Sequence, residues 1–125
     1  VTQENVYNEL GVPMIESLMS GYNGCIFVYG PTGSGKTYSI LGGDGEEAGI
    51  LPRVVKGLFT RTTQVEEGSS YEVRVAYIEI YNDTLRDLLV PPGGQSQNLQ
   101  IVLHPTQGIS VAFLQEHLVQ NATEV

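Results

Sequence analysis

The sequence has few basic side chains and no tryptophan. Its 125 residues include 6 lysines and arginines against 14 aspartates and glutamates, which gives a formal net charge of −8. A surface of this sign repels nucleic acid and anionic lipid, so we expect no nucleic acid and no membrane among its partners. Any site for an anionic ligand must then be built from local donors that overcome the field of the whole chain.

Cysteine and long hydrophobic runs are also scarce. The single cysteine, Cys25, cannot form an internal disulfide, which fits a reducing compartment, and its apolar neighbours predict a small core residue. No apolar stretch reaches the roughly 20 residues that a transmembrane helix needs, and no signal-peptide pattern stands at the start. The composition, 41% hydrophobic and 16% charged, is typical of packed globular structure. We therefore expect a cytoplasmic protein.

Hydrophobic periodicity predicts alternating helices and strands. A first helix begins after a Thr2 cap and runs to a stop at Gly21, with an interruption at Gly11 and Pro13. Residues 25–29, Cys-Ile-Phe-Val-Tyr, are typical of a strand buried on both faces of a parallel sheet. The chain opens on Val rather than Met, so we expect an excised segment of a longer protein.

The middle of the chain continues the pattern. A helix is predicted to begin over residues 36–41, and a second helix over Ile50–Thr62, with Pro52 in its first turn. The predicted buried stripe of that second helix is Val54, Val55, Leu58 and Phe59.

Three further elements are expected after a polar turn at residues 66–70. Residues 71–81 alternate as one long strand rich in β-branched and aromatic side chains. Asp83 is expected to cap a short helical turn that ends at residues 91–94, and residues 99–113 form an antiparallel hairpin. The turn carries three apolar side chains, Leu85, Leu88 and Leu89.

Residues 30–37, GPTGSGKT, follow the pattern Gly-x-x-x-x-Gly-Lys-Thr between an apolar strand and a helix start. This spacing lets backbone N–H groups converge on phosphate oxygens. Glycines permit the close approach, Lys36 reaches the β- and γ-phosphates, and the Thr37 hydroxyl ligates Mg²⁺. The predicted phosphate-binding residues are Gly30, Pro31, Thr32, Gly33, Ser34, Gly35, Lys36 and Thr37.

The octad does not identify a reaction, because helicases and secretion-type ATPases carry a similar one. Glu79, Asp83 and Asp87 lie in or after an apolar strand, where an acidic side chain could orient a metal-bound water in another P-loop class. Such side chains otherwise act as caps or lie in solvent. Both interpretations stay open on spacing alone.

The residues around the octad resemble kinesin motor domains. The flank Gly21-Tyr22-Asn23-Gly24 with residues 26–30, and then Tyr38, Ser39 and Ile40, is similar to the segments that kinesins place on either side of their P-loop. Residues 73–89, VRVAYIEIYNDTLRDLL, form the most specific block. Shorter blocks match in the same order: Gln3, Val6 and Tyr7; residues 49–53; residues 108–111; Gln115, Glu116 and Val119.

Two positions depart from the family pattern. Pro31 stands where kinesins usually have Gln, which removes a side chain and an N–H beside the phosphates, so we expect altered or weaker nucleotide contact. Ile40 replaces the usual Met, a volume-conserving change that we expect to be neutral.

The resemblance implies an incomplete α/β P-loop NTPase-type central sheet flanked by helices, with residues 1–125 forming part of one kinesin motor domain. It implies ATP and Mg²⁺ as cofactors, Tyr38 beside the adenine or packed on the sheet, and a microtubule (tubulin) partner on the cytoskeleton. The 95–112 region is similar to a microtubule-side element. A stalk through which the parent protein dimerises is not in this sequence.

The resemblance also implies parts that the sequence lacks. The family's two switch motifs, Asn-x-x-Ser-Ser-Arg-Ser-His and Asp-Leu-Ala-Gly-Ser-Glu, would follow Val125, and its Arg-x-Arg-Pro strand would precede Val1. We therefore expect no catalytic residue within the chain, no ATP hydrolysis by it alone, and exposed strand edges that favour self-association. Two other functions stay open: a non-motile nucleotide-binding or adaptor segment, and an unrelated P-loop ATPase that uses Glu79 or Asp83.

Overall fold

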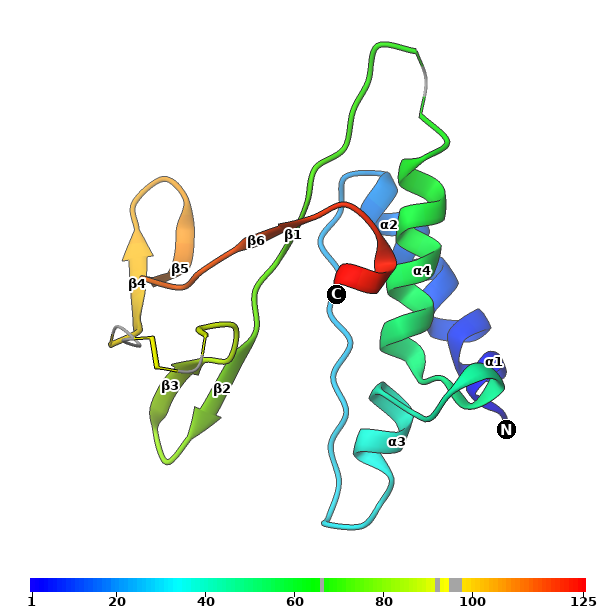
Figure 1. Ribbon diagram of the computed structural model, residues 1–125, viewed down its shortest axis with the longest axis horizontal. Helices are drawn as coiled ribbons and strands as arrows, with labels where there is room; N and C mark the ends of the chain where they lie inside the picture. Colours follow the sequence, from blue (N-terminus) through cyan, green and yellow to red (C-terminus); the bar gives the residue numbers. More distant parts are fainter. Residues whose placement is uncertain (66, 92, 95–97) are drawn as a thin grey trace. The chain divides into compact units, whose positions relative to one another are not determined.

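A computed structural model describes residues 1–65, 67–91, 93–94 and 98–125. It divides into two compact units: Val1–Tyr71 with Asn121–Val125, and Glu72–Gln120. The first unit contains α-helices and the second contains three pairs of β-strands (Figure 1). Across the described ranges, no helix is long and apolar enough to cross a membrane.

The first unit opens with one helical segment in three parts. These are α1 (Gln3–Val6), a π-helical turn (Tyr7–Gly11) and α2 (Val12–Met19). Thr2 caps the segment as predicted, because its hydroxyl accepts a hydrogen bond from the Asn5 N–H at 3.2 Å and the Asn5 side chain accepts one from the Thr2 N–H at 2.9 Å.

The predicted interruption of this helix is wrong. At Gly11 the helix widens instead of breaking, since the Val12 N–H donates to the Tyr7 carbonyl, which is the spacing of a π-turn. Pro13 then lies in the first turn of α2, where a missing N–H does little harm.

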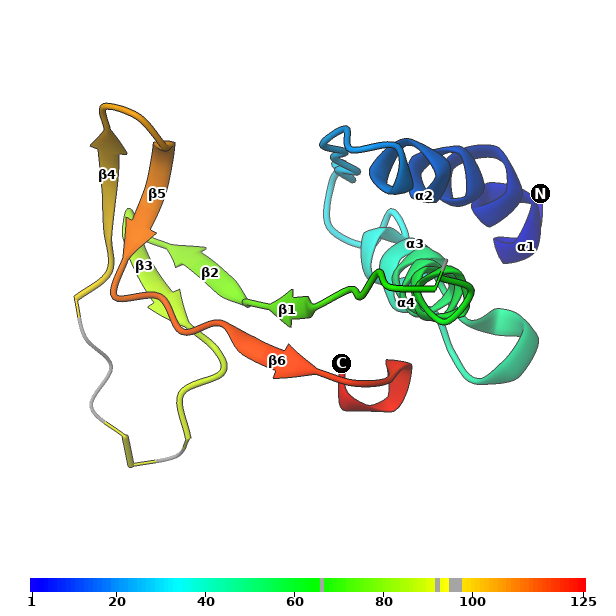
Figure 2. The same ribbon diagram turned by 90° about the horizontal axis from the view of Figure 1, so that it is seen from above.

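The predicted second helix forms as α4 (Ile50–Thr62), beside the first helical segment (Figure 2). The most buried apolar side chains of this unit are Ile15 of α2 and Ile50, the first residue of α4, which are 3% and 4% exposed. The predicted stripe is only half-buried: Val54, Val55, Leu58 and Phe59. In the described residues, no large side chain is fully buried, so the packed core of this unit is small.

Two glycines let the helices approach closely. A Cβ added at Gly57 would lie 2.5 Å from the Tyr7 hydroxyl and 2.7 Å from the Ile15 Cδ1, and one added at Gly11 would lie 3.0 Å from the Val54 Cγ2. Larger residues would therefore force the helices apart.

The predicted helix start after the octad forms as α3 (Lys36–Ile40). The chain then makes a 3₁₀ turn (Gly45–Glu47) and enters α4 after a bridge between Gly42 and Ala48. Gly42 has a φ of 69° and no room for a side chain against the Glu47 carbonyl, so this connection is tight.

The predicted buried strand over residues 25–29 is wrong. The segment is extended but pairs with no described strand (Figure 1), and Phe27 and Tyr29 are 76% and 83% exposed. Cys25 is also exposed, so its predicted place in a core is wrong too. The physical reason is that an extended backbone gains its hydrogen bonds only from a neighbouring strand. The two rings stack on each other instead, with centroids 5.6 Å apart.

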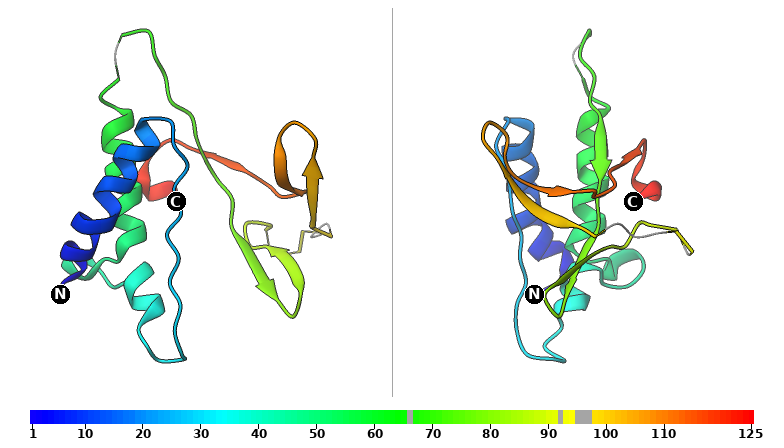
Figure 3. Two further views of the ribbon diagram at one scale, coloured as in Figure 1. Left: turned by 180° about the vertical axis from the view of Figure 1, so that it is seen from behind. Right: turned by 90° about the vertical axis from the view of Figure 1, so that its left-hand side faces the viewer.

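In its described residues, the second unit consists of three antiparallel pairs (Figure 3). β1 (Val73–Val75) pairs with β6 (His117–Val119), β2 (Ile78–Tyr81) with β3 (Thr84–Asp87), and β4 (Gln100–His104) with β5 (Gly108–Ala112). The last pair is the predicted hairpin.

Two predictions for this unit are wrong. Residues 71–81 form two strands, because β1 and β2 pair with different partners. The predicted helical turn after Asp83 is a hairpin, since Asn82 and Asp83 have φ of 48° and 58° and form the two-residue turn between β2 and β3. The residues expected at its end include Pro92, which lies outside the described residues, as do Glu66 of the polar turn and residues 95–97 of the region before the hairpin.

A buried carboxylate connects two backbone segments of the second unit. Asp87 is 8% exposed, and its two oxygens accept hydrogen bonds at 2.9 Å from the N–H groups of Leu89 and Gln115. Residues far apart in sequence are thereby joined through one side chain.

We expect Asp87→Ala to loosen this unit, because two N–H groups lose their acceptor at a cost of about 1–3 kcal/mol each. Amide hydrogen exchange would show faster exchange at Leu89 and Gln115. Asp44→Ala, an exposed acidic position without a side-chain cap hydrogen bond, is the control and should leave both amides unchanged. Equal protection in both variants would contradict the role of Asp87.

Candidate functional site

The octad 30–37 forms the loop that leads into α3. Its three glycines have positive φ values, 155° at Gly30, 81° at Gly33 and 90° at Gly35, which side chains rarely adopt. The Ser34 N–H donates to the Pro31 carbonyl at 3.2 Å and closes a tight turn. The local conformation therefore depends on the glycines that the sequence pattern singled out.

Lys36 lies across this loop. Its ammonium Nζ donates to the Gly30 carbonyl at 2.8 Å and to the Pro31 carbonyl at 2.7 Å. An ammonium has three donors, so one remains for a further acceptor. The positive charge is thus held beside the loop backbone, where an anion in the loop would meet it.

Thr37 is exposed in the first turn of α3. N–H groups in the first turn of a helix have no carbonyl one turn before them, so those of α3 point toward whatever occupies the loop. No group of three His, Cys, Asp or Glu side chains in the described residues could hold a metal ion. Mg²⁺, which commonly takes one or two protein oxygens with phosphate and water, fits the Thr37 hydroxyl as a single protein ligand.

Tyr38 is 52% exposed and lines a cavity of about 980 Å³ together with Ser39, Arg53 and the start of the first helical segment. The ring is therefore open to a ligand.

Gln3 is the site residue to which the sequence assigned no role. Its side chain is 7% exposed, and its Nε2 donates to the Tyr38 carbonyl at 2.7 Å and more weakly to the Glu47 carbonyl at 3.4 Å. Gln3 thereby ties the first helical segment to the end of α3. A glutamine in a first helical turn is ordinary, so only the fold reveals this contact.

The acidic candidates have local partners in the second unit. Glu79 forms an ion pair with Arg86 across the β2–β3 hairpin at 3.6 Å. Asp83 lies in the hairpin turn, and Asp87 accepts two backbone N–H groups. A structural role in the hairpin or in backbone hydrogen bonding accounts for each of these three positions.

Comparison with known proteins gives a consistent result. A family model of the kinesin motor domain matches residues 1–125. Kinesin-like protein KIF16B of Homo sapiens is 44% identical over 128 residues, which cover 100% of this chain and 10% of that protein. Kinesin-like protein unc-104 of Caenorhabditis elegans is 46% identical over 111 residues, covering 86% of this chain and 7% of that protein.

Solved structures resemble the whole chain as well. The structure of a fast kinesin superposes with a TM-score of 0.90 at 34% identity, over 99% of this chain and 35% of that one. A KIF14 dimer with AMP-PNP in complex with a microtubule gives a TM-score of 0.87 at 35% identity and the same coverage. The chain therefore spans about a third of these solved chains and about a tenth of the length of the relatives.

We expect Gln3→Ala to free α3 from the first helical segment and to lower the free energy of unfolding by about 1 kcal/mol, the usual contribution of one hydrogen bond. Thermal unfolding followed by circular dichroism measures the change. Gln64→Ala is the matched control, since this glutamine is exposed at the end of α4. If the two variants unfold at the same temperature, Gln3 does not position α3.

Proposed function

The chain belongs to the kinesin motor domain family, and from that premise we propose that it is the ATP-binding part of a motor ATPase that moves along microtubules. Residues 1–125 would form part of one motor domain, in the cytoplasm on the cytoskeleton. The observation that carries the proposal is the loop 30–37, whose three glycines have positive φ values and whose backbone carbonyls hold the Lys36 ammonium.

The proposed ligand is ATP with Mg²⁺. Bound nucleotide would supply phosphate oxygens as acceptors. Lys36 keeps one free donor for them, and the N–H groups in the first turn of α3 would supply further donors. The Thr37 hydroxyl would be the protein's ligand to the metal, and Tyr38 would stack beside the base in the cavity that it lines. The rest of the loop, Gly30 to Gly35, would surround the phosphates with main-chain groups.

Hydrolysis would require groups that the described residues do not show. A transferred phosphoryl group needs an oriented water and a partner for the developing charge. In the second unit, Glu79 and Asp87 are already engaged by Arg86 and by backbone N–H groups. We therefore propose that the chain binds nucleotide and that turnover depends on other parts of the motor.

The second unit would contact the microtubule. The β4–β5 hairpin exposes apolar side chains on paired positions: Ile101 is 65% exposed, Leu103 78% and Ile109 74%. This hairpin lies in the 95–112 region, whose sequence is similar to a microtubule-side element of kinesins. The chain's net charge of −8 works against an acidic partner surface, so the hairpin alone would hold weakly.

We expect the chain to bind Mg-ATP and Lys36→Ala to weaken binding at least about tenfold, because a charge-assisted contact to phosphate is lost. Isothermal titration measures binding, and steady-state phosphate release measures turnover. Arg74→Ala removes a cation of the second unit and is the control. Binding that is equal in wild type and Lys36→Ala would refute the site, while Lys36-dependent turnover by this chain alone would point to an unrelated P-loop ATPase.

We also expect the chain to remain in the supernatant when it is sedimented with microtubules at 0.15 M salt, because its net charge of −8 opposes an acidic partner surface and the exposed hairpin alone would hold weakly. A KIF14 or fast-kinesin motor domain is the positive control. Stoichiometric co-sedimentation of the chain would contradict this expectation and show that residues 1–125 suffice for binding.

A further inference from the structure

The first helical segment and α4 line a cleft of about 340 Å³. It shares Arg53 and Lys56 with the cavity beside Tyr38, and its other lining residues have no part in the nucleotide proposal. Tyr7, Val12 and Ile15 supply its apolar part, and Arg53, Lys56 and Arg61 supply positive charge. Among the residues that the structure describes, no aspartate or glutamate lines it. Its size is at the lower end of the roughly 300–1,000 Å³ that small-molecule sites occupy.

The charge in this cleft is opposite to that of the whole chain. Half of the chain's 6 lysines and arginines lie on α4, and the α4 sequence, ILPRVVKGLFTRT, contains no acidic residue. A positive cleft on a protein with a net charge of −8 is a local feature that concentrates anions where the rest of the surface repels them.

The cations keep most of their charge unneutralised. The Arg53 Nε and Nη2 donate to the Ala48 carbonyl at 2.9 Å and the Glu46 carbonyl at 2.8 Å, which fixes the side chain without a carboxylate partner. In the described part of the chain, the Lys56 ammonium has no hydrogen bond or ion pair, and the residue is exposed. Its ammonium is therefore available to a ligand.

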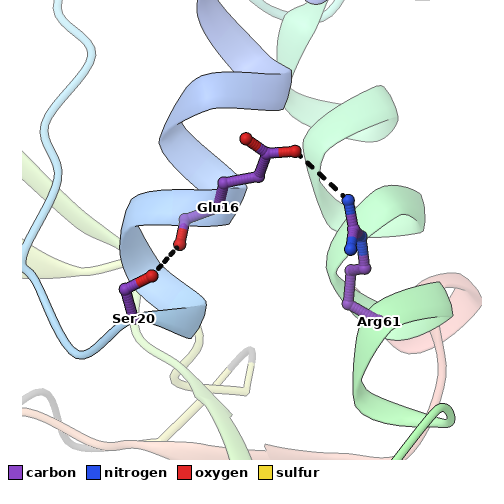
Figure 4. Close-up of polar contacts among 3 residues, drawn as sticks. All are labelled: Glu16, Ser20 and Arg61. Atoms are coloured by element: carbon purple, nitrogen blue, oxygen red, sulfur yellow. Dashed lines mark hydrogen bonds and ion pairs between the residues drawn. The ribbon is translucent and has the colours of Figure 1, made fainter.

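Arg61 has one acidic neighbour at the end of the cleft. Its Nη2 lies 3.4 Å from the Glu16 carboxylate (Figure 4), and the two side chains are 50% and 62% exposed. Exposed pairs of this kind contribute little, about 0–1 kcal/mol, so a stronger anion can replace Glu16. The Ser20 hydroxyl donates to the Glu16 backbone carbonyl at 2.9 Å and not to the carboxylate, so it does not strengthen the hold on that carboxylate.

We propose that this cleft is a second ligand site, for a small amphiphilic anion: an aromatic or branched apolar group that carries a phosphate or a carboxylate. The apolar group lies against Tyr7, Val12 and Ile15, and the anionic group accepts hydrogen bonds from Lys56 and Arg61. Both halves contribute, since neither a bare cation pair nor a shallow apolar surface holds a ligand well in water.

The test titrates phenyl phosphate into the 125-residue chain and follows backbone amide shifts by NMR. Gly57 and Thr60 line this cleft and not the cavity beside Tyr38, so their amides report it alone. We expect saturable shifts there, and binding at least about tenfold weaker for inorganic phosphate and for benzyl alcohol, which each lack one half of the probe.

Variants that remove a positive or a negative charge should change the affinity for phenyl phosphate in opposite directions. Lys56→Gln and Arg61→Gln should weaken phenyl phosphate binding about five- to tenfold, whereas Glu16→Gln should strengthen it a few-fold because a competing carboxylate is removed. Arg74→Gln, a similarly exposed cation in the second unit, is the matched control and should change nothing. Circular dichroism spectra that match the wild type show that the variants remain folded.

Lys36→Ala separates this site from the proposed nucleotide site, because it should leave the shifts of Gly57 and Thr60 unchanged. Shifts that are confined to the loop 30–37 and vanish in Lys36→Ala would overturn the cleft proposal and leave the nucleotide site standing. Equal binding by inorganic phosphate, or the same effect from Glu16→Gln as from Lys56→Gln, would also overturn it.

Discussion

The contact between the first helical segment and α4 determines how the candidate nucleotide site is held. Gly11 and Gly57 permit that contact, since a Cβ at Gly57 would collide with Tyr7 and Ile15. Gln3, in the same segment, holds the Tyr38 carbonyl of α3. A change at the helix contact would thus be transmitted to the turn that carries Lys36 and Thr37.

Side chains of α4 and of the first helical segment also hold the connection from α3 to α4 by hydrogen bonds. The Arg53 side chain of α4 donates to the carbonyls of Glu46 and Ala48, and Gln3 reaches the Glu47 carbonyl from the other helix. Three successive carbonyls are therefore engaged by side chains of two elements. These contacts fix a short glycine-rich connection that has little apolar contact of its own.

Local sequence patterns predicted the helices, the loop 30–37 and the β4–β5 hairpin, because caps, glycines and periodicity act within a few residues. Pairing between strands that are distant in sequence was not predicted, since local patterns do not specify such partners. Residues 25–29 have a buried strand's composition without a described partner, and residues 71–81 are divided between two partners. The hairpin turn at Asn82 and Asp83 was missed because the same residue types also cap helices.

The distribution of charge is what would let an acidic chain hold the proposed anionic ligands. Long-range repulsion from a net charge of −8 is screened by salt, whereas hydrogen bonds to Lys36 or to first-turn N–H groups act at contact distance. The few cations are correspondingly concentrated: Lys36 at the loop, and Arg53, Lys56 and Arg61 on one helix without acidic residues. The helix contact places α4 beside the first helical segment. The same packing that positions the loop therefore also brings these three cations next to the apolar side chains of the first segment. Both proposed anion sites thus depend on one pair of helices.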